Sequence, residues 1–245
     1  MTVQQEQTSQ FDIAAEFDRQ VGTLLDLGYP KESSITEQEL VGLLAPLRDV
    51  VLRVSQDLAA PTNERVPFLL VVTKALVPAD RVMPLTRHKG KPGFVSADTT
   101  DIHRFDAIED VELPDARAYV VLDVERGAEY LNVRPDDAVA GLRERGRTPL
   151  TVDEGIAFVL QFPGSLEKNH CFSLAASRCG DRRVPALWIS KGAPKLGWCW
   201  AGNPHTWLGT ASAGTRLSPR QRSTQGSGDA PLLYDTETSR RGDLP

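Results

Sequence analysis

The chain has 245 residues, of which 40% are hydrophobic and 25% charged, and its formal net charge is −5. That length is enough for a sizeable core, in one domain with an appendage or in two small domains. The longest apolar runs, 68–72 and 118–122, are far shorter than the roughly 20 residues of a membrane-spanning helix. The first thirty residues lack a basic start followed by an apolar block, and three cysteines are too few for a disulfide framework. We therefore predict a cytoplasmic protein without a membrane anchor.

Charge is distributed unevenly along the chain. Residues 171–245 contain 5 acidic and 10 basic residues, which leaves 28 acidic and 18 basic residues in the remainder. The last third therefore carries +5 and the rest carries −10. Such an asymmetry marks a surface for an anionic partner, or it arises because two parts of one protein complement each other. We favour the second interpretation.

The first sixty residues predict a small helical unit. Apolar residues recur at helical spacing over Phe11–Leu25, and Gly28 ends this helix. Thr36 and Glu39 form a capping box for a second helix. Pro46 interrupts the apolar pattern of that helix, so it either kinks the helix or begins a further one.

The pattern then changes to that of a sheet with two inserted helices. The run Val66–Thr73 is typical of a strand buried on both faces, and Tyr119–Val124 predicts a second strand. An amphipathic helix begins at Pro135. Thr151 with Glu154 forms another capping box, which starts the second inserted helix.

The C-terminal part predicts a β-meander. Four strand-like segments are separated by turns rich in Gly, Asn and Pro: 171–176, 184–190, 196–201 and 206–212. The fold class is therefore α+β: an N-terminal helical unit followed by a mixed or antiparallel sheet with two inserted helices and a C-terminal β-meander. The expected divisions are a disordered start at 1–10, a helical unit at 11–60, a sheet domain at 61–216 in one compact unit with the helices, and a disordered tail at 217–245.

Four blocks of the sequence resemble a known family. They are GKPGF at 90–94, RGRTPLTVDEGIA at 145–157, CGDRRVPALWIS at 179–190 and LGWCWAGNPHTWLG at 196–209. The family is a set of actinobacterial chains known only as a domain of unknown function, and the resemblance covers about residues 11–216. It implies an actinobacterial, cytoplasmic protein of a single unit. It brings no activity, substrate or catalytic residue, so the function must be argued from the residues.

All four tryptophans lie within residues 188–207. Trp198 and Trp200 alternate around Cys199, so on a strand both indoles project from one face. Aromatic faces beside cations suit a small ligand that combines a ring with a phosphate or carboxylate, and they also suit stacked nucleic-acid bases. The alternative is that the tryptophans belong to the sheet core and the arginines lie at turns. Nucleic acid is disfavoured because the chain is acidic overall and non-specific affinity comes mainly from phosphate neutralisation.

A loop around Gly90 is a second candidate for anion capture. Arg87 and Lys89 stand beside glycines whose backbone can approach an anion closely. The alternative is a solvated basic loop, and the spacing matches no phosphate-loop motif. Together with the tryptophan segment, this gives the predicted ligand-binding residues: Arg87, Lys89, Arg182, Arg183, Trp198, Trp200, Asn203 and Trp207.

Catalysis is an alternative for the same region. His205 lies in a turn between two tryptophan-bearing strands and is suited to act as a general base, with Cys199 or Asp181 assisting. Ser212 lies in a T-A-S-A-G sequence that lacks the first glycine of a nucleophile elbow. No close pair such as C-x-x-C supports a zinc site, so we assign no metal and no cofactor.

We therefore expect a binding module for a small anionic, partly aromatic ligand. The alternatives are an enzyme that uses His205 and a module that binds an acidic protein partner through the basic C-terminal third. We predict no contact with a membrane. The oligomeric state, the identity of the ligand and a lid role for the N-terminal helices are left open.

Overall fold

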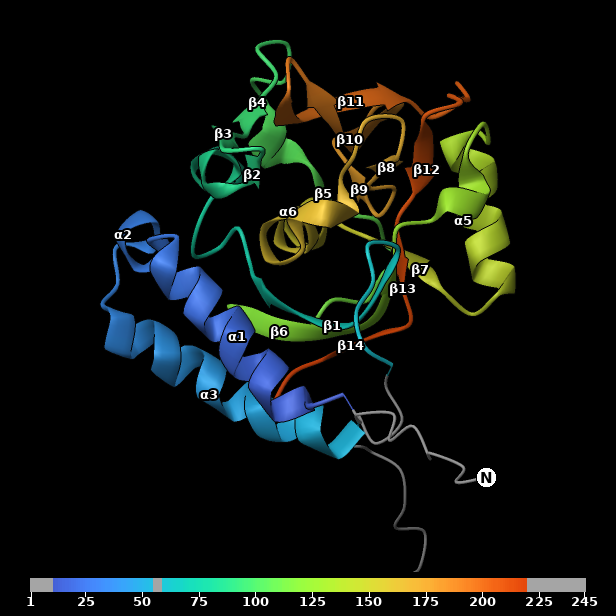
Figure 1. Ribbon diagram of the computed structural model, residues 1–245. Helices are drawn as coiled ribbons and strands as arrows, with labels where there is room; N and C mark the ends of the chain where they lie inside the picture. The colour runs from blue at the N-terminus through green and yellow to red at the C-terminus, as the bar shows by residue number, and fades with distance from the viewer. Residues whose placement is uncertain (1–10, 55–58, 220–245) are drawn as a thin grey trace, which may run out of the picture.

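The computed structural model describes residues 11–54 and 59–219 (Figure 1). The predicted start at 1–10 and residues 220–245 of the predicted tail lie outside these ranges. The helices are α1 (Ile13–Asp26), α2 (Tyr29–Ser33), α3 (Glu37–Val54), α4 (Ala79–Val82), α5 (Pro135–Glu144) and α6 (Val152–Gln161), with short 3-10 turns at Met83–Leu85, Ile102–Arg104, Ala128–Tyr130 and Pro163–Ser165. The strands are β1 (Arg65–Val72), β2 (Arg87–His88), β3 (Lys91–Pro92), β4 (Phe94–Val95), β5 (Asp106–Ala107), β6 (Ala118–Glu125), β7 (Thr148–Pro149), β8 (Cys171–Ser173), β9 (Ser177–Arg178), β10 (Arg183–Ser190), β11 (Ala193–Trp200), β12 (Leu208–Thr210), β13 (Ser212–Ala213) and β14 (Thr215–Leu217). The predicted α+β class is confirmed.

The N-terminal helices follow their local signals. Gly28 adopts the left-handed conformation (φ 78°) at the end of α1, where a side chain would be strained. The Thr36–Glu39 capping box is present, with Glu39 Oε2 accepting from Thr36 N at 2.7 Å. Pro46 neither ends α3 nor starts a new helix, because α3 continues through it as one element. No helix in the described part of the chain has the length and apolar character needed to cross a membrane.

The first sheet has the order β1-β6-β13-β7, with β14 also paired to β6. The strands β1 and β6 pair antiparallel over their full length, and every residue of β1 after Arg65 is buried. The outer edge of β1 is covered by the buried Gln20 of α1, whose amide donates to the Phe68 carbonyl (3.0 Å) and accepts from Leu70 N (2.8 Å). A side-chain amide thus takes the place of a neighbouring strand, which protects an exposed edge from unwanted pairing.

Helix α6 lies at the centre of the molecule, between the two sheets (Figure 1). Nearly all of its residues are buried, which is typical of a helix packed on every side. Gly155 permits this close packing, because a Cβ there would lie 2.2 Å from Leu174 Cδ2. The sequence predicted the helix and its capping box, both confirmed, but did not predict its central position.

The second sheet has the order β12-β8-β10-β11-β4. The predicted meander describes β8, β10 and β11, which follow one another as antiparallel neighbours. It fails at β12, which pairs parallel to β8 on the far side of the sheet. The segment 201–207 therefore spans two intervening strands, and residues 208–217 then continue from the second sheet into the first. The last of these strands, β14, includes Leu217, the first residue assigned to the tail.

A buried ion pair fastens this last strand. Arg216 of β14 donates to Glu154 of α6, with an Nη2–Oε2 distance of 2.8 Å, and both side chains are buried. Glu154 also accepts from Tyr119 Oη at 2.9 Å and from Thr151 N at 2.8 Å. Arg216 donates to the Pro149 carbonyl at 2.9 Å. One pair of charges thus links β14, α6, β6 and β7.

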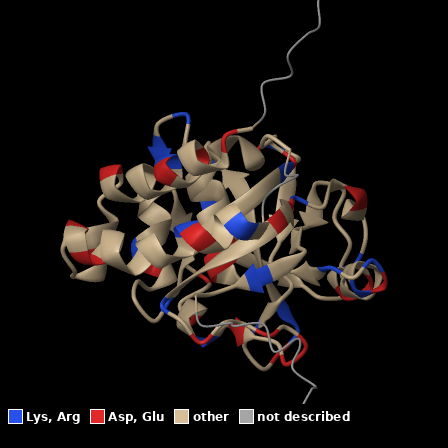
Figure 2. Cartoon of the chain, turned by 90° about the horizontal axis from the view of Figure 1, so that it is seen from below, with Lys and Arg blue, Asp and Glu red and all other residues tan. Residues whose placement is uncertain are grey.

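Other arginines of the basic C-terminal third also lie beside carboxylates of the same chain. Arg183 contacts Asp101 at 2.6 Å, and Arg178 lies 3.9 Å from Asp136. Figure 2 shows basic and acidic residues interspersed over the fold rather than separated into two regions. This agrees with the favoured interpretation of the charge asymmetry, in which two parts of one protein complement each other.

The carboxyl group of Asp153 makes the stability of the fold depend on pH. Its carboxylate accepts from Lys74 N at 2.8 Å, and burial raises its pKa to about 6. Because the folded-state pKa lies above the unfolded value of 3.8, ionisation of Asp153 lowers the stability of the fold as the pH rises from about 4 to about 6, and this loss is complete above about pH 6 and absent below about pH 4. We expect Asp153→Asn to raise the free energy of unfolding by roughly 1–3 kcal/mol at pH 8 and to leave it nearly unchanged at pH 4, as measured by urea denaturation.

The control for this measurement is Glu112→Gln, which changes an exposed carboxylate and should alter stability little at either pH. An equal effect of Asp153→Asn at both pH values would contradict the assigned cause.

Candidate aromatic ligand site

A cavity of about 310 Å³ lies where the tryptophan segment meets the second sheet. Its lining residues are Trp188, Trp198, Cys199, Trp200, Asn203, His205 and Trp207. All of them except Trp188 were candidates from the sequence. The fold therefore brings most of the predicted aromatic and catalytic candidates around one small space.

The walls of the cavity come from a hairpin and a crossing loop. Strands β10 and β11 pair so that Trp188 lies opposite Lys195 and Arg183 opposite Trp200. The loop 201–207 is held against the start of α5 and the turn before it, because Asp136 N donates to the Ala201 carbonyl (3.2 Å) and Asn132 N to the His205 carbonyl (2.9 Å). These backbone bonds place Asn203 and His205 beside the tryptophans.

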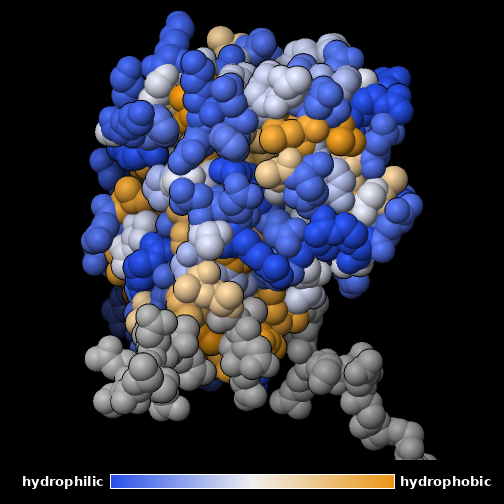
Figure 3. Space-filling view, turned by 45° about the vertical axis from the view of Figure 1, so that its right-hand side comes forward, coloured by the Kyte–Doolittle hydropathy of each residue, from blue (hydrophilic) through white to orange (hydrophobic). Residues whose placement is uncertain are grey.

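The aromatic rings form two groups. Trp198 and Trp200 meet edge to face with centroids 4.8 Å apart, as expected for neighbours on one strand face. Trp207 packs against Trp188 at 6.2 Å and against His205 at 5.2 Å. The Trp200 side chain remains 47% exposed, which is unusual for a large hydrophobic group in this fold. Figure 3 brings the α5 side of the molecule forward and shows a mainly hydrophilic surface with limited hydrophobic areas.

The cations near the cavity differ in their freedom. Arg183 is bound on two edges, by Asp101 and by Asp181, and its guanidinium packs 5.7 Å from the centroid of Trp198. The two carboxylates therefore already neutralise the charge of Arg183. Its guanidinium positions Trp198, and neither of its hydrogen-bonding edges is left for a ligand. Arg182 is exposed, and its nearest carboxylate is that of Asp136 at 3.8 Å.

Lys195 is a third cation beside the aromatic group. Its Nζ lies 4.9 Å from the centroid of Trp188, a cation–π contact. Neither Trp188 nor Lys195 was among the predicted site residues. Their pairing could have been found from the sequence, because a hairpin turn at Lys191-Gly192 places residues 188 and 195 opposite each other.

Arg87 and Lys89 do not line this cavity. They belong to the β2–β3 hairpin, where Arg87 Nη1 donates to the Thr86 carbonyl at 2.9 Å. Lys89 and Gly90 both have positive φ (49° and 82°) and form the hairpin turn. The glycine therefore serves the turn, and the structure does not join this loop to the tryptophan site.

The geometry offers little for nucleophilic catalysis. Burial raises the pKa of the Cys199 thiol to about 11, so the reactive thiolate is scarce at neutral pH. Cys199 and His205, both described, share no hydrogen bond, and Asp181 binds Arg183. Ser212 is buried, and its hydroxyl accepts from Arg147 Nε at 2.9 Å. Within residues 11–54 and 59–219, no three His, Cys, Asp or Glu side chains are grouped to hold a metal ion.

The thiols provide a test of this assignment. Cys171 and Cys199 are buried, whereas Cys179 is partly exposed. We expect a disulfide reagent at pH 7.5 to modify Cys179 first, and the other two thiols only when the chain unfolds. Cys179→Ser should remove the native-state reaction. Rapid modification of Cys199 in that variant would instead indicate an activated thiol and favour the catalytic alternative.

Comparison with known proteins bears on the family and not on the chemistry. No curated protein and no solved structure matches the chain. A family model described as a family of unknown function, DUF5701, matches residues 23–219, which include the aromatic cavity and the Glu154–Arg216 pair. The chain therefore belongs to the DUF5701 family of unknown function.

Proposed function

We propose that this protein binds a small anionic, partly aromatic ligand in the cavity between the β10–β11 hairpin and the loop 201–207. One observation carries the proposal: four indoles and an imidazole surround a space of about 310 Å³, and one indole, Trp200, is left half-exposed there. Pockets of this size lined by aromatic side chains with a few polar groups are typical of small-molecule sites. A planar ring is the group that such walls accept best.

The charge of the ligand has two candidate partners near the aromatic walls. Arg182 is exposed, and its guanidinium lies beside Gly202, in the loop that also bears Asn203: a Cβ added at Gly202 would be 3.0 Å from Arg182 Nη2. Lys195 lies over the ring of Trp188. Arginine binds carboxylate and phosphate through two parallel hydrogen bonds, so Arg182 is the better candidate for the anionic group.

The alternatives have weaker support. An enzyme that uses His205 as a general base lacks a free acidic or thiolate assistant, since Asp181 is engaged by Arg183 and the Cys199 thiol is buried. A partner-binding role would need a free basic surface, whereas Arg178, Arg183 and Arg216 contact carboxylates of the same chain. A cytoplasmic location and an actinobacterial source remain predictions from the sequence.

The proposal is tested with benzoate, indole-3-acetate and phenyl phosphate as probes, followed by tryptophan fluorescence and calorimetry. We expect at least one probe to bind with a Kd in the micromolar to low millimolar range, that is, about −4 to −8 kcal/mol. Trp200→Ala should weaken its binding at least tenfold because a stacking wall is lost. Arg182→Gln should weaken binding of the anionic probe but not that of its uncharged analogue, benzamide in the case of benzoate.

Arg53→Gln serves as the matched control, because Arg53 is an exposed arginine of α3 on the other side of the first sheet. Its affinity for the probes should equal that of the wild type. Failure of all three probes to bind, or unchanged affinity in a folded Trp200→Ala variant, would overturn the proposal.

A further inference from the structure

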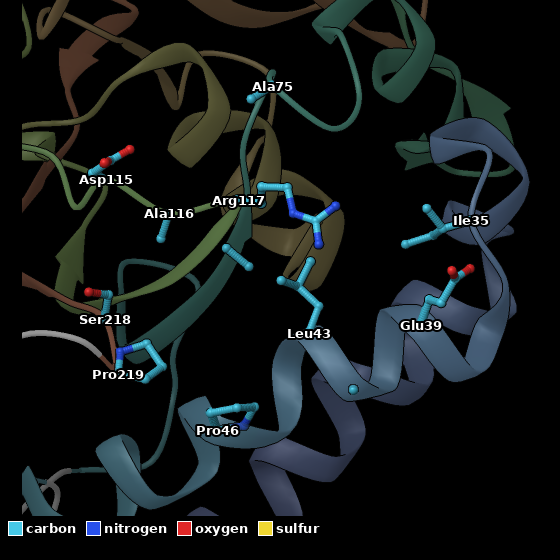
Figure 4. A pocket seen from close by; sticks show the side chains of 12 residues that line it. Ile35, Glu39, Leu43, Pro46, Ala75, Asp115, Ala116, Arg117, Ser218 and Pro219 are labelled. Carbon is cyan, nitrogen blue, oxygen red and sulfur yellow. The ribbon is translucent and has the colours of Figure 1, made fainter.

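A second and larger cavity lies on the opposite side of the first sheet. It has a volume of about 800 Å³, within the range of small-molecule sites, and lies between α3 and the edge where β1 ends and β6 and β14 meet the surface (Figure 4). Its lining residues are Ile35, Glu39, Gly42, Leu43, Pro46, Ala75, Asp115, Ala116, Arg117, Ala118, Ser218 and Pro219. None of these was a candidate from the sequence.

The cavity is open because small residues line the side nearest the sheet. Ala75, Ala116 and Ala118 carry only methyl groups there. On the helix side, Leu43 and Pro46 present apolar surface. Most of the walls are therefore suited to an apolar body rather than to a fully polar ligand.

Two opposite charges face the cavity from its two walls. In Figure 4 the side chain of Arg117, the residue before β6, extends toward α3. Within the described residues its guanidinium makes no hydrogen bond and no ion pair. Glu39 stands on α3, and its pKa is lowered chiefly by the hydrogen bond from Thr36 N, with a smaller contribution from Arg117. Glu39 is thus ionised at neutral pH.

Both walls keep unused hydrogen-bonding capacity. The two donors of Thr36 go to Glu39 Oε2, at 2.7 and 2.9 Å, which leaves Oε1 without a partner among the described residues. Pro46 has no N–H, so the Gly42 carbonyl lacks its usual helical donor. The helix wall therefore offers acceptors, and the sheet wall offers the five N–H groups of a guanidinium.

We propose that this cavity binds a small zwitterion with an apolar body, of the amino-acid or short-peptide class. The carboxylate of the ligand pairs with Arg117, its ammonium group with Glu39, and its side chain packs on Leu43 and Pro46. A simple anion fits less well, because Glu39 and Asp115 give the lining a net charge of −1. A simple cation would leave Arg117 unpaired. The site is separate from the aromatic cavity and does not depend on its function.

Calorimetry on the full chain with L-leucine, L-phenylalanine and the dipeptide Leu-Leu tests the proposal. We expect one of these ligands to bind with a Kd below about 1 mM. Tighter binding of Leu-Leu would assign the site to peptides, and tighter binding of a free amino acid would assign it to amino acids. N-acetyl-leucine, which lacks the ammonium group, and leucinamide, which lacks the carboxylate, should each bind at least tenfold more weakly.

Variants separate this site from the aromatic one. Arg117→Gln should abolish the preference for leucine over leucinamide, and Glu39→Gln the preference for leucine over N-acetyl-leucine, while circular dichroism shows both variants folded. Trp200→Ala should leave this binding unchanged. Absence of binding by all three ligands, equal binding of the blocked derivatives, or wild-type affinity in folded Arg117→Gln would overturn the proposal.

Discussion

The buried ion pair between Glu154 and Arg216 is the interaction on which the rest of this fold depends. Two charges removed from water are tolerated only when each is paired and its remaining hydrogen-bonding groups are satisfied. Glu154 meets this condition through Arg216, Tyr119 and the backbone of Thr151. The same carboxylate therefore caps the central helix and fastens the last strand, so the two features cannot be varied independently.

This anchoring has a direct consequence for the aromatic cavity. The chain runs from the loop 201–207 through β12 in the second sheet to β14 in the first, and Arg216 is fixed at the end of that path. The loop is also held by α5, whose Asp136 N donates to the Ala201 carbonyl, and by Asn132 N, which donates to the His205 carbonyl. The cavity thus lies on a segment held at both ends, which favours a preformed binding site over one assembled by large movements.

Local signals in the sequence predicted much of the fold. Both capping boxes, the strands β1 and β6, and the β10–β11 hairpin follow from short-range patterns, and the alternation of side chains along β11 places Trp198 and Trp200 together as expected. Partners distant in the chain could not be predicted in this way. Arg216 carried no signal beyond its place in the basic C-terminal third, because its partner Glu154 lies 62 residues earlier. Arg183 was predicted to bind the anionic group of a ligand, but its guanidinium is already bound by the carboxylate of Asp101, 82 residues earlier.

The cavity beside α3 shows the same limit. Its lining comes from four segments far apart in sequence, and alanines that leave room for a ligand carry no sequence signal of their own. Pro46 gave an ambiguous prediction because a proline within a helical pattern either ends or bends a helix. In the structure it lies in the middle of α3 and contributes to the wall of that cavity.

A double-mutant cycle on Glu154 and Arg216 tests this account most directly. Glu154→Gln and Arg216→Met each leave one buried charge without its partner, so each should lower the free energy of unfolding by roughly 3–5 kcal/mol. The double variant buries neither charge, and we expect it to be more stable than the sum of the two losses by at least about 2 kcal/mol. Additive losses, or single losses below about 1 kcal/mol, would contradict the claim that this pair fastens β14, and with it the end of the cavity-forming segment, to the central helix.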